Sequence, residues 1–368
     1  MLDNWLSPVL FHEDDSIQKL SKEHFGRNIA IYINDFPVLE RIDVAIIGVS
    51  KIEADKARKS LYSLDYPFHA IRIADLGNIR NEDPSFIIPL IKELLQSNIF
   101  PILIGRNASS SYAQFQAYNS LKQSTNLVCI DERIRYDYAS TDADQYYLNN
   151  IINAENSNLF NLGVIGSQSH FTSEALLKMM NNRNFDHIRL GKLKGEAEDV
   201  EPFIRDADIL FFNLNALKQS EAPGIESPSP SGLLSEEACK LSRYAGISDK
   251  LTSIGFYGFY SENDRCNQTS QVLAQLIWYF LDGFYHRIGD YPASMDGLVE
   301  YIVEFKNLEK PVTFWKSKKS GRWWMQIPVK TKKKHQRHKL IPCSYNDYQL
   351  ACKDSIPDRL VNAYKRFS

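Results

Sequence analysis

Ile42-Asp-Val-Ala-Ile-Ile-Gly-Val49 is a short, β-branched and almost continuously apolar run, and a segment of helical period, residues 53–64, follows it directly. A strand that is apolar along its whole length is typical of a parallel sheet covered on both faces. The same alternation of apolar runs and helical segments continues to about residue 285. It predicts a single three-layer α/β/α domain with a mostly parallel sheet of about eight strands.

The other expected strands share this apolar character, and most are followed by a helical segment. The strands are expected at residues 71–77, 100–105, 126–131, 162–166, 208–215 and 251–259. The helices are expected at residues 85–97, 110–122, 172–180, 194–205 and 270–285, with one more beginning at Ser235. We therefore expect the α/β domain to occupy residues 1–305.

The chain changes character after about residue 305. Two apolar, Trp-containing runs flank a basic, Ser- and Gly-containing turn, which predicts a β-hairpin over residues 311–328. A basic linker, residues 330–339, and an amphipathic helix at about residues 356–367 follow the hairpin. Residues 306–368 are thus expected to form a basic C-terminal appendage and no further βα unit.

The net charge of −2 conceals an uneven distribution along the chain. Residues 316–368 contain 14 Lys or Arg and 3 Asp or Glu, a charge of +11. Of the 43 basic and 45 acidic residues in the whole chain, 29 and 42 therefore lie in residues 1–315, a charge of −13. With 43% hydrophobic and 24% charged residues, the composition is that of a folded globular protein and excludes disordered and collagen-like classes.

Membrane and disulfide-rich classes are also disfavoured. No apolar run approaches the roughly 18 residues needed to cross a bilayer, and the start, Met1-Leu-Asp-Asn-Trp5, has no signal-peptide pattern. The five cysteines are scattered and show no C-x-x-C spacing, so reduced thiols are expected instead of a zinc site. We expect a cytoplasmic protein without membrane insertion.

Ligands of parallel α/β sheets gather beyond the carboxyl ends of the strands. Four polar segments follow expected strands: residues 105–109, 131–135, 213–218 and 258–264. No G-x-x-x-x-G-K-[ST] or G-x-S-x-G motif occurs, which argues against a P-loop and against a serine-hydrolase elbow. These four segments are the candidate site.

Three scaffold motifs identify a family that this chain resembles. Ala74-Asp-Leu-Gly77, Glu221-Ala-Pro-Gly224 and Ser231-Gly-Leu-Leu-Ser-Glu-Glu-Ala238 match, in order and spacing, the D-x-G, A-P-G and G-L-T-x-x-E-A motifs of the arginase-like ureohydrolases. The resemblance spans about residues 42–284 and is nearest to the formimidoylglutamase-type members. It implies an arginase-like fold, hydrolysis of a guanidine or amidine C–N bond by a manganese pair, and a homo-oligomer.

The resemblance also implies which residues occupy the metal positions of the family. Those six positions hold Ala108, Asp131, Arg133, Arg135, Asn213 and Asn215, while Asn107, Gly258 and Asp264 fall on other positions of the pocket motifs. The six sum to about +1, where two divalent cations require several carboxylates. We therefore expect that the manganese pair is lost, that no other cofactor replaces it, and that no catalytic residue remains.

Two further inferences come from residues at the same edge. Residues 131, 133 and 135 alternate along an extended segment, so Arg133 or Arg135 is expected to form a charge-assisted bond with Asp131. His170 follows another expected strand, but a lone histidine without a carboxylate or nucleophile partner is more typical of a loop than of a catalytic base.

Three functional interpretations remain open. The first is a pseudoenzyme, a catalytically inactive ureohydrolase homologue that acts as a binding, regulatory or assembly component. The second is an active manganese-dependent ureohydrolase, of formimidoylglutamase, arginase or agmatinase type, whose true ligands lie at other positions. The third is a sensor of a small anionic metabolite gripped by Arg133 and Arg135 in the former metal pocket.

The basic tail is the expected partner-binding region. Residues 316–339 contain ten Lys or Arg and no Asp or Glu, interleaved with tryptophans. The expected contact residues are Trp315, Lys316, Lys318, Lys319, Arg322, Trp323, Trp324, Lys332, Lys333 and Lys334. They predict contact with the acidic body of the same or a neighbouring subunit, or with an acidic protein partner, and less readily with nucleic acid.

Overall fold

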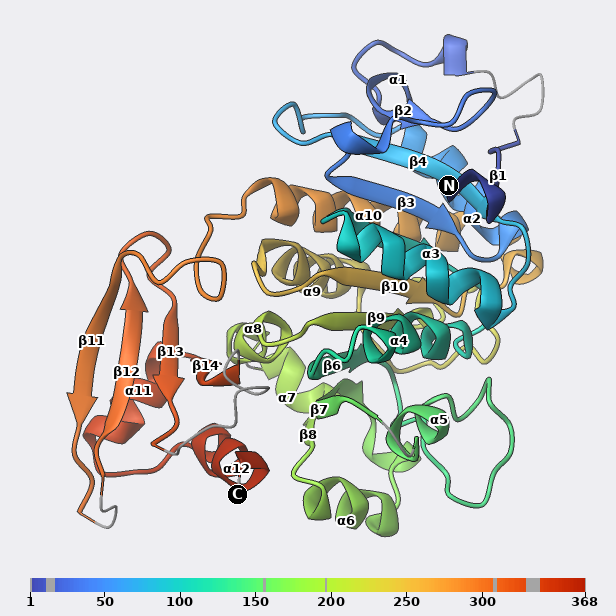
Figure 1. Ribbon diagram of the computed structural model, residues 1–368. Helices are drawn as coiled ribbons and strands as arrows, with labels where there is room; N and C mark the ends of the chain where they lie inside the picture. The colour runs from blue at the N-terminus through green and yellow to red at the C-terminus, as the bar shows by residue number, and fades with distance from the viewer. Residues whose placement is uncertain are drawn as a thin grey trace.

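The computed structural model describes residues 2–10, 17–154, 157–195, 197–306, 310–328 and 338–367. A large α/β region holds the N-terminal and central parts of the chain, and a smaller antiparallel sheet lies beside it (Figure 1). Lys332, Lys333 and Lys334 lie outside the described residues.

The central sheet has ten strands in the order β1-β4-β3-β5-β10-β9-β6-β7-β8, with β2 also paired to β4. Their bounds are β1 Leu6–Ser7, β2 Ala30–Ile31, β3 Val44–Gly48, β4 Ile73–Ile79, β5 Phe100–Ile104, β6 Thr125–Ile130, β7 Leu159–Ser167, β8 Asp186–Arg189, β9 Ile209–Asn213 and β10 Ser253–Tyr257. Every pair is parallel except β1 with β4. The mostly parallel sheet is therefore confirmed, and two short strands at its β4 edge extend it.

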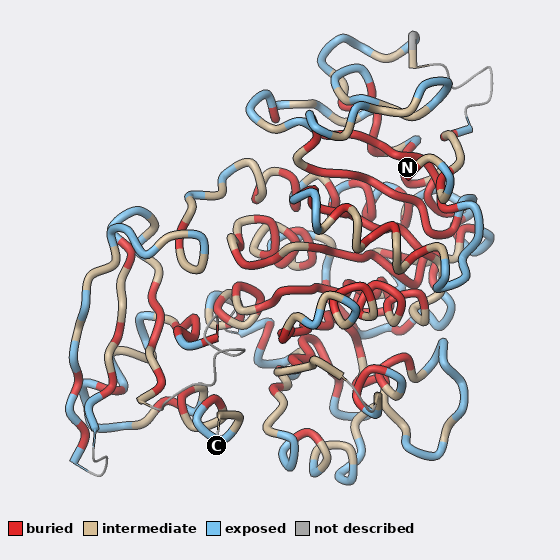
Figure 2. Tube along the Cα trace, in the orientation of Figure 1, coloured by how far each residue is buried: buried red, intermediate tan, exposed pale blue. Residues whose placement is uncertain are grey.

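Helices cover both faces of this sheet and bury its strands (Figure 2). Their bounds are α1 Phe25–Asn28, α2 Lys51–Tyr62, α3 Pro84–Gln96, α4 Ser110–Ser120, α5 Leu148–Ile152, α6 Glu174–Asn182, α7 Leu190–Gly195, α8 Ala197–Arg205, α9 Ser235–Ile247 and α10 Gln268–Tyr285. One face packs against α2, α8, α9 and α10, and the other against α3, α4 and α5. The three-layer architecture is confirmed.

Helix α3 shows how local sequence sets these elements. Asp83 accepts a hydrogen bond from the backbone N–H of Ser85, and Pro84 occupies the first turn, where its missing N–H costs nothing. Apolar residues at helical spacing then face the sheet, among them Ile87, Leu90 and Leu94, all fully buried.

The C-terminal sheet has four antiparallel strands in the order β11-β12-β13-β14. Their bounds are β11 Leu298–Val303, β12 Val312–Ser317, β13 Trp323–Gln326 and β14 Leu340–Cys343, and helices α11 Tyr345–Cys352 and α12 Asp358–Phe367 complete the region. The expected hairpin is formed by β12 and β13, and the expected terminal helix is α12. The sheet also contains β11, which precedes residue 306, because its apolar residues pair along the whole of β12.

Arg205 joins the two sheets. This buried side chain at the end of α8 donates hydrogen bonds to the carbonyl oxygens of Trp323 (3.1 Å) and Cys343 (3.2 Å). Its guanidinium lies over the Trp324 ring, 4.5 Å from the centroid. A guanidinium offers five N–H donors in a fixed plane. The single side chain of Arg205 can therefore bond to carbonyl groups of two strands and also stack on the Trp324 ring.

None of the described helices has the length and apolar character required to span a bilayer.

Candidate functional site

Three of the positions that the resemblance aligns with metal ligands, Asp131, Arg135 and Asn213, meet around the buried carboxylate of Asp131, which follows β6. Arg135 donates to both of its oxygens, at 3.1 Å from Nε to Oδ2 and 3.3 Å from Nη2 to Oδ1. Asn213 Nδ2 donates to Oδ2 at 2.9 Å, and the Tyr147 hydroxyl donates to the same oxygen at 3.3 Å. Both oxygens of the carboxylate are thus used by side chains of this protein.

Arg135, and not the side chain of Arg133, makes the expected ion pair with Asp131. The Arg133 guanidinium instead donates to Glu132 Oε1 at 2.7 and 3.0 Å and lies over the Phe171 ring. Arg135 also comes within 3.6 Å of Glu132. The cluster, defined here as Asp131, Glu132, Arg133 and Arg135, therefore contains two carboxylates and two guanidiniums, and its formal charge is close to zero.

Asn213 and Asn215 are held by backbone geometry at the end of β9. The Asn213 side-chain oxygen accepts a hydrogen bond from the backbone N–H of Asn215 at 3.1 Å and so caps the short helix Leu214–Ala216. Because Asn213 Nδ2 donates to Asp131 at the same time, its side chain has a fixed orientation. An amide with both ends used in this way holds the edge of the sheet together and offers no carboxylate to a metal ion.

Gly258 lies against Asn213 at the end of β10 and has no room for a side chain. Its φ is +86°, and a Cβ atom would stand 2.5 Å from Asn213 Oδ1. The resemblance places a glutamate at this position, and such a side chain is sterically incompatible with the present position of Asn213.

The other expected pocket residues do not join the hydrogen bonds around Asp131. Asp264 is buried and accepts hydrogen bonds from the backbone N–H groups of Thr269 and Ser270, both at 3.0 Å, at the start of α10. Ala108 and Asn107 are half-buried in the turn before α4. His170 is exposed in the turn that follows β7, with its ring against that of Phe171.

Burial sets the protonation of the groups around Asp131. It raises the pKa of the Glu132 carboxyl, although the two neighbouring guanidiniums oppose the rise. It also holds the pKa of Tyr147 well above its ordinary value, so that this phenol keeps its proton and donates to Asp131. One oxygen of Glu132, Oε2, is buried without a hydrogen-bond partner.

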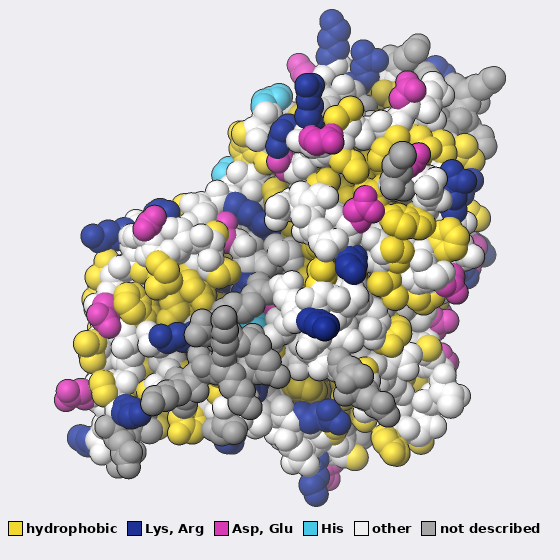
Figure 3. Space-filling view, in the orientation of Figure 1, with side chains coloured by type: hydrophobic (Ala, Val, Ile, Leu, Met, Phe, Trp, Pro, Cys, Tyr) yellow, Lys and Arg dark blue, Asp and Glu magenta, His cyan; other side chains and the backbone are white. Residues whose placement is uncertain are grey.

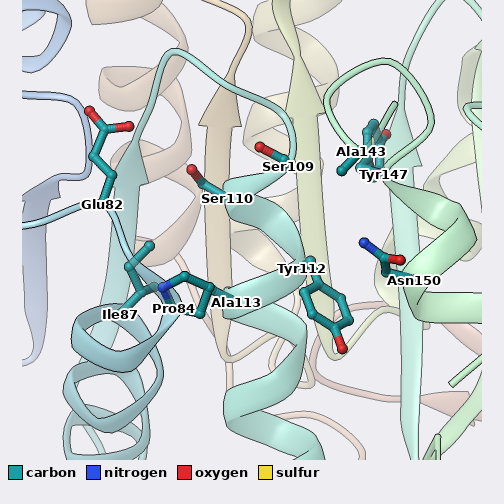
Figure 4. Close-up of a pocket in the computed structure, with 10 residues that line it drawn as sticks. All are labelled: Glu82, Pro84, Ile87, Ser109, Ser110, Tyr112, Ala113, Ala143, Tyr147 and Asn150. Atoms are coloured by element: carbon teal, nitrogen blue, oxygen red, sulfur yellow. The ribbon is translucent and has the colours of Figure 1, made fainter. Parts of the chain in front are cut away.

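A cavity of about 230 Å³ lies next to this cluster, between the start of α3, the start of α4 and α5 (Figure 4). Ser109 and Ser110 stand at the start of α4, with Glu82 on one side of them and Ala143 on the other. The Ser109 hydroxyl donates a hydrogen bond to the carboxylate of Asp144. Tyr147 lines the cavity and touches Asp131, so it is the wall between the two.

Sequence reasoning missed Glu132 and Tyr147. Strict strand alternation turns residue 132 away from residue 131, yet the chain leaves β6 at that point and both carboxylates reach Arg135. Tyr147 is the last residue of the seventeen-residue loop between β6 and α5, and nothing in its neighbouring sequence marks it. The one available signal was the adjacency of two acidic and two basic residues in Asp131-Glu-Arg-Ile-Arg135.

These residues do not fit a manganese pair. Ala108 has no donor atom, Asn213 turns its N–H group toward Asp131, and Arg133 and Arg135 bring positive charge. Within the described residues, no three His, Cys, Asp or Glu side chains are grouped so that they could hold a metal ion. Hard divalent cations need several oxygen ligands and compensating negative charge, and here the carboxylates of Asp131 and Glu132 are already paired with guanidiniums.

Comparisons with known proteins agree with the fold. The arginase family profile matches residues 45–282. The formimidoylglutamase of Staphylococcus haemolyticus is 23% identical over 225 residues, covering 57% of this chain and 71% of that protein. Among solved structures, Trypanosoma cruzi formiminoglutamase with Mn²⁺ matches with a TM-score of 0.60 and 14% identity, over 69% of this chain and 100% of that one. The Bacillus subtilis formimidoylglutamase matches with a TM-score of 0.61 and 17% identity, over 71% of this chain and 92% of that chain.

Proposed function

From the premise that this chain belongs to the arginase family, we propose that it is a non-catalytic member, which uses the arginase-like scaffold for binding, regulation or assembly. The observation that carries the proposal is the state of Asp131. Its two oxygens are bonded to Arg135, Asn213 and Tyr147. A metal ion at this position has to displace those bonds and then stand beside two guanidiniums.

Internal compensation of the Asp131 charge by Arg135 supports the proposal energetically. A guanidinium in a bidentate pair neutralises a buried carboxylate without any ion from solution. The pair therefore takes over the stabilising role that a cation has in a carboxylate-lined site. In the family that this chain resembles, metal ions activate the attacking water, and no group of the cluster around Asp131 supplies that chemistry here.

The anionic-metabolite interpretation finds no support in this pocket. Arg133 is bonded to Glu132, and Arg135 is bonded to Asp131. An anion entering the pocket therefore meets guanidiniums whose charge is already balanced by a carboxylate, which weakens its attraction to them.

Three of the residues expected to contact a partner are instead engaged within this chain, since Trp323 and Trp324 are buried and the half-buried Arg322 approaches Glu201. Trp323 and Trp324 are 6% and 1% exposed, and Arg322 lies 3.7 Å from Glu201 and is bonded to the carbonyl of Ile247. Lys318 and Lys319 are exposed in the turn between β12 and β13, with the half-buried Lys316 and Trp315 beside them. We propose Lys318 and Lys319, with Trp315 and Lys316, as the described part of the partner surface; a cytoplasmic location stays a prediction.

The test compares the natural chain with a variant that restores the metal positions, Ala108→His, Arg133→His, Arg135→Asp, Asn213→Asp and Asn215→Asp. Each chelator-treated protein is titrated with MnCl₂ in a thermal-shift assay and then assayed on formimidoylglutamate, arginine and agmatine. A ligand that binds only the native state raises the melting temperature, so a rise is expected in a folded variant and none in the natural chain. Manganese-dependent hydrolysis of any of these substrates by the natural chain overturns the proposal.

A further inference from the structure

A second cavity, of about 430 Å³, lies at the amino ends of β3 and β4, the edge of the sheet opposite the cluster around Asp131. The arrows of these strands in Figure 1 point away from it. Its walls come from η4 (Leu39–Arg41) with the residues before it and from residues 66–73, which lead into β4. This basic cleft, as we call it, plays no part in the family resemblance.

The positive charge of the basic cleft comes from Arg41, because Arg72 is paired with Asp43 just outside the lining. Arg41, Arg72 and His69 line it, and no Asp or Glu does. Arg72 is held by Asp43, with hydrogen bonds of 2.6 and 3.0 Å, and so has a fixed direction. Within the described residues the Arg41 side chain is exposed and makes no hydrogen bond or ion pair. Arg41 is therefore a guanidinium that is available to a ligand.

An apolar surface adjoins these cationic groups. Val38 is 63% exposed, and Pro37, Ile71 and Tyr66 contribute further apolar lining. Exposed apolar surface bordered by unpaired donors is typical of binding sites, where the apolar part provides affinity and the polar groups fix orientation. The volume also falls in the range of small-molecule sites, roughly 300–1,000 Å³.

We propose that the basic cleft binds a small organic anion, in which a carboxylate or phosphate group is attached to an apolar body. Arg41 holds the anionic group in a bidentate pair, and the N–H groups of Arg72 that Asp43 leaves free add to it. The apolar body packs against Val38 and Ile71. Because the cleft lies at the opposite edge of the sheet, the proposal does not depend on whether the former metal site is active.

Calorimetric titration of the full-length protein with benzoate, phenyl phosphate and the neutral benzamide tests the proposal, with 8-anilinonaphthalene-1-sulfonate as a fluorescent probe of the same class. We expect at least one anion to bind, and Arg41→Gln to weaken its affinity about tenfold or more. Benzamide is expected to bind at least tenfold more weakly than benzoate, and the two anions distinguish a carboxylate from a phosphate preference.

The matched control is Arg189→Gln, because Arg189 is exposed on β8, far along the sheet from the cleft. The Arg189→Gln variant should bind the anions with the same affinity as the natural chain. A filling variant, Ala30→Trp, places a large ring at a lining position and should abolish binding without touching a charge. Equal affinity of Arg41→Gln and the natural chain overturns the proposal, and so does the absence of binding of all three anions at 10 mM.

Discussion

Arg135 stands at the centre of the buried polar cluster. It is 7% exposed and reaches both Asp131, which is fully buried, and Glu132. Burial disfavours its charged form, and the neighbouring carboxylates reverse that effect, so the pKa of its guanidinium is raised overall. Removing one partner from such a pair leaves an uncompensated charge in a medium that solvates it poorly.

We therefore expect Arg135→Met to lower the free energy of unfolding by about 3–5 kcal/mol. Urea denaturation of the variant and the natural chain measures the difference. The double variant Asp131→Asn with Arg135→Met removes both charges, and its free energy of unfolding should fall much less than that of the single variant. A double variant as unstable as the single one shows that the pair itself, and not the stranded carboxylate, carries the stability.

Glu132 predicts a pH dependence of stability. Burial raises its pKa in the folded state above the ordinary value of 4.5, so the folded state binds the proton more tightly than the unfolded state does. Its contribution therefore favours folding below pH 4.5 and is lost as the pH rises through the folded pKa. Glu132→Gln should reduce the fall in stability above pH 4.5, measured as unfolding free energy between pH 4 and 8. An unchanged slope contradicts this assignment.

At this scale the alternation of residues 131, 133 and 135 predicted that Arg133 or Arg135 would pair with Asp131, and Arg135 forms that pair. It did not predict that Glu132 would balance Arg133, because that bond depends on how the chain turns after β6. The closeness of Gly258 to Asn213 depends on strands β9 and β10 being neighbours, which only the assembled sheet establishes.

The elements of the central sheet were predictable where the strands are continuously apolar, as in β3, β5 and β9. Strand β8, Asp186–Arg189, was missed because it has four residues and only one fully apolar position. Strand β14, Leu340–Cys343, follows the basic linker and was missed because these residues become a strand only by pairing with β13. Short strands of this kind are defined by their neighbours more than by their own residues.

Arg205, at the end of helix α8, couples the central sheet to the C-terminal sheet. Arg205→Met should remove two hydrogen bonds to strand carbonyls and the stacking on Trp324, and we expect a loss of about 3 kcal/mol in unfolding free energy. Hydrogen exchange should increase in β13 and β14 and stay unchanged in β3 and β5. Arg189→Met, on an exposed arginine, is the control. Equal exchange in β13 and β14 of both variants contradicts the coupling.

Across the whole molecule, part of the basic tail neutralises the acidic body. Arg366 in α12 pairs with Asp186 at 2.8 Å, and Arg322 approaches Glu201. Lys318 and Lys319 make no ion pair within the described residues and remain exposed. In Figure 3 several Lys and Arg side chains rim the C-terminal part of the molecule. The tail thus has an inner part, which forms ion pairs with the α/β region, and an outer part, whose Lys318 and Lys319 have no acidic partner among the described residues.

If the outer part drives self-association, the molar mass in solution should exceed 42.3 kDa at 50 mM salt and fall toward it at 500 mM. The double variant Lys318→Glu with Lys319→Glu should have a molar mass of about 42.3 kDa at both salt concentrations. Size-exclusion chromatography with light scattering measures the mass. A natural chain that is monomeric at both salt concentrations rules out self-association through these lysines.

Our main proposal is that an internal ion pair stands in place of the metal ions in this arginase-family scaffold. Its most direct test is the manganese content of the full-length protein, purified without chelator from manganese-supplemented cells and measured by inductively coupled plasma mass spectrometry. We expect far less than one manganese ion per chain, because Arg135 occupies the Asp131 carboxylate. About two manganese ions per chain would contradict it.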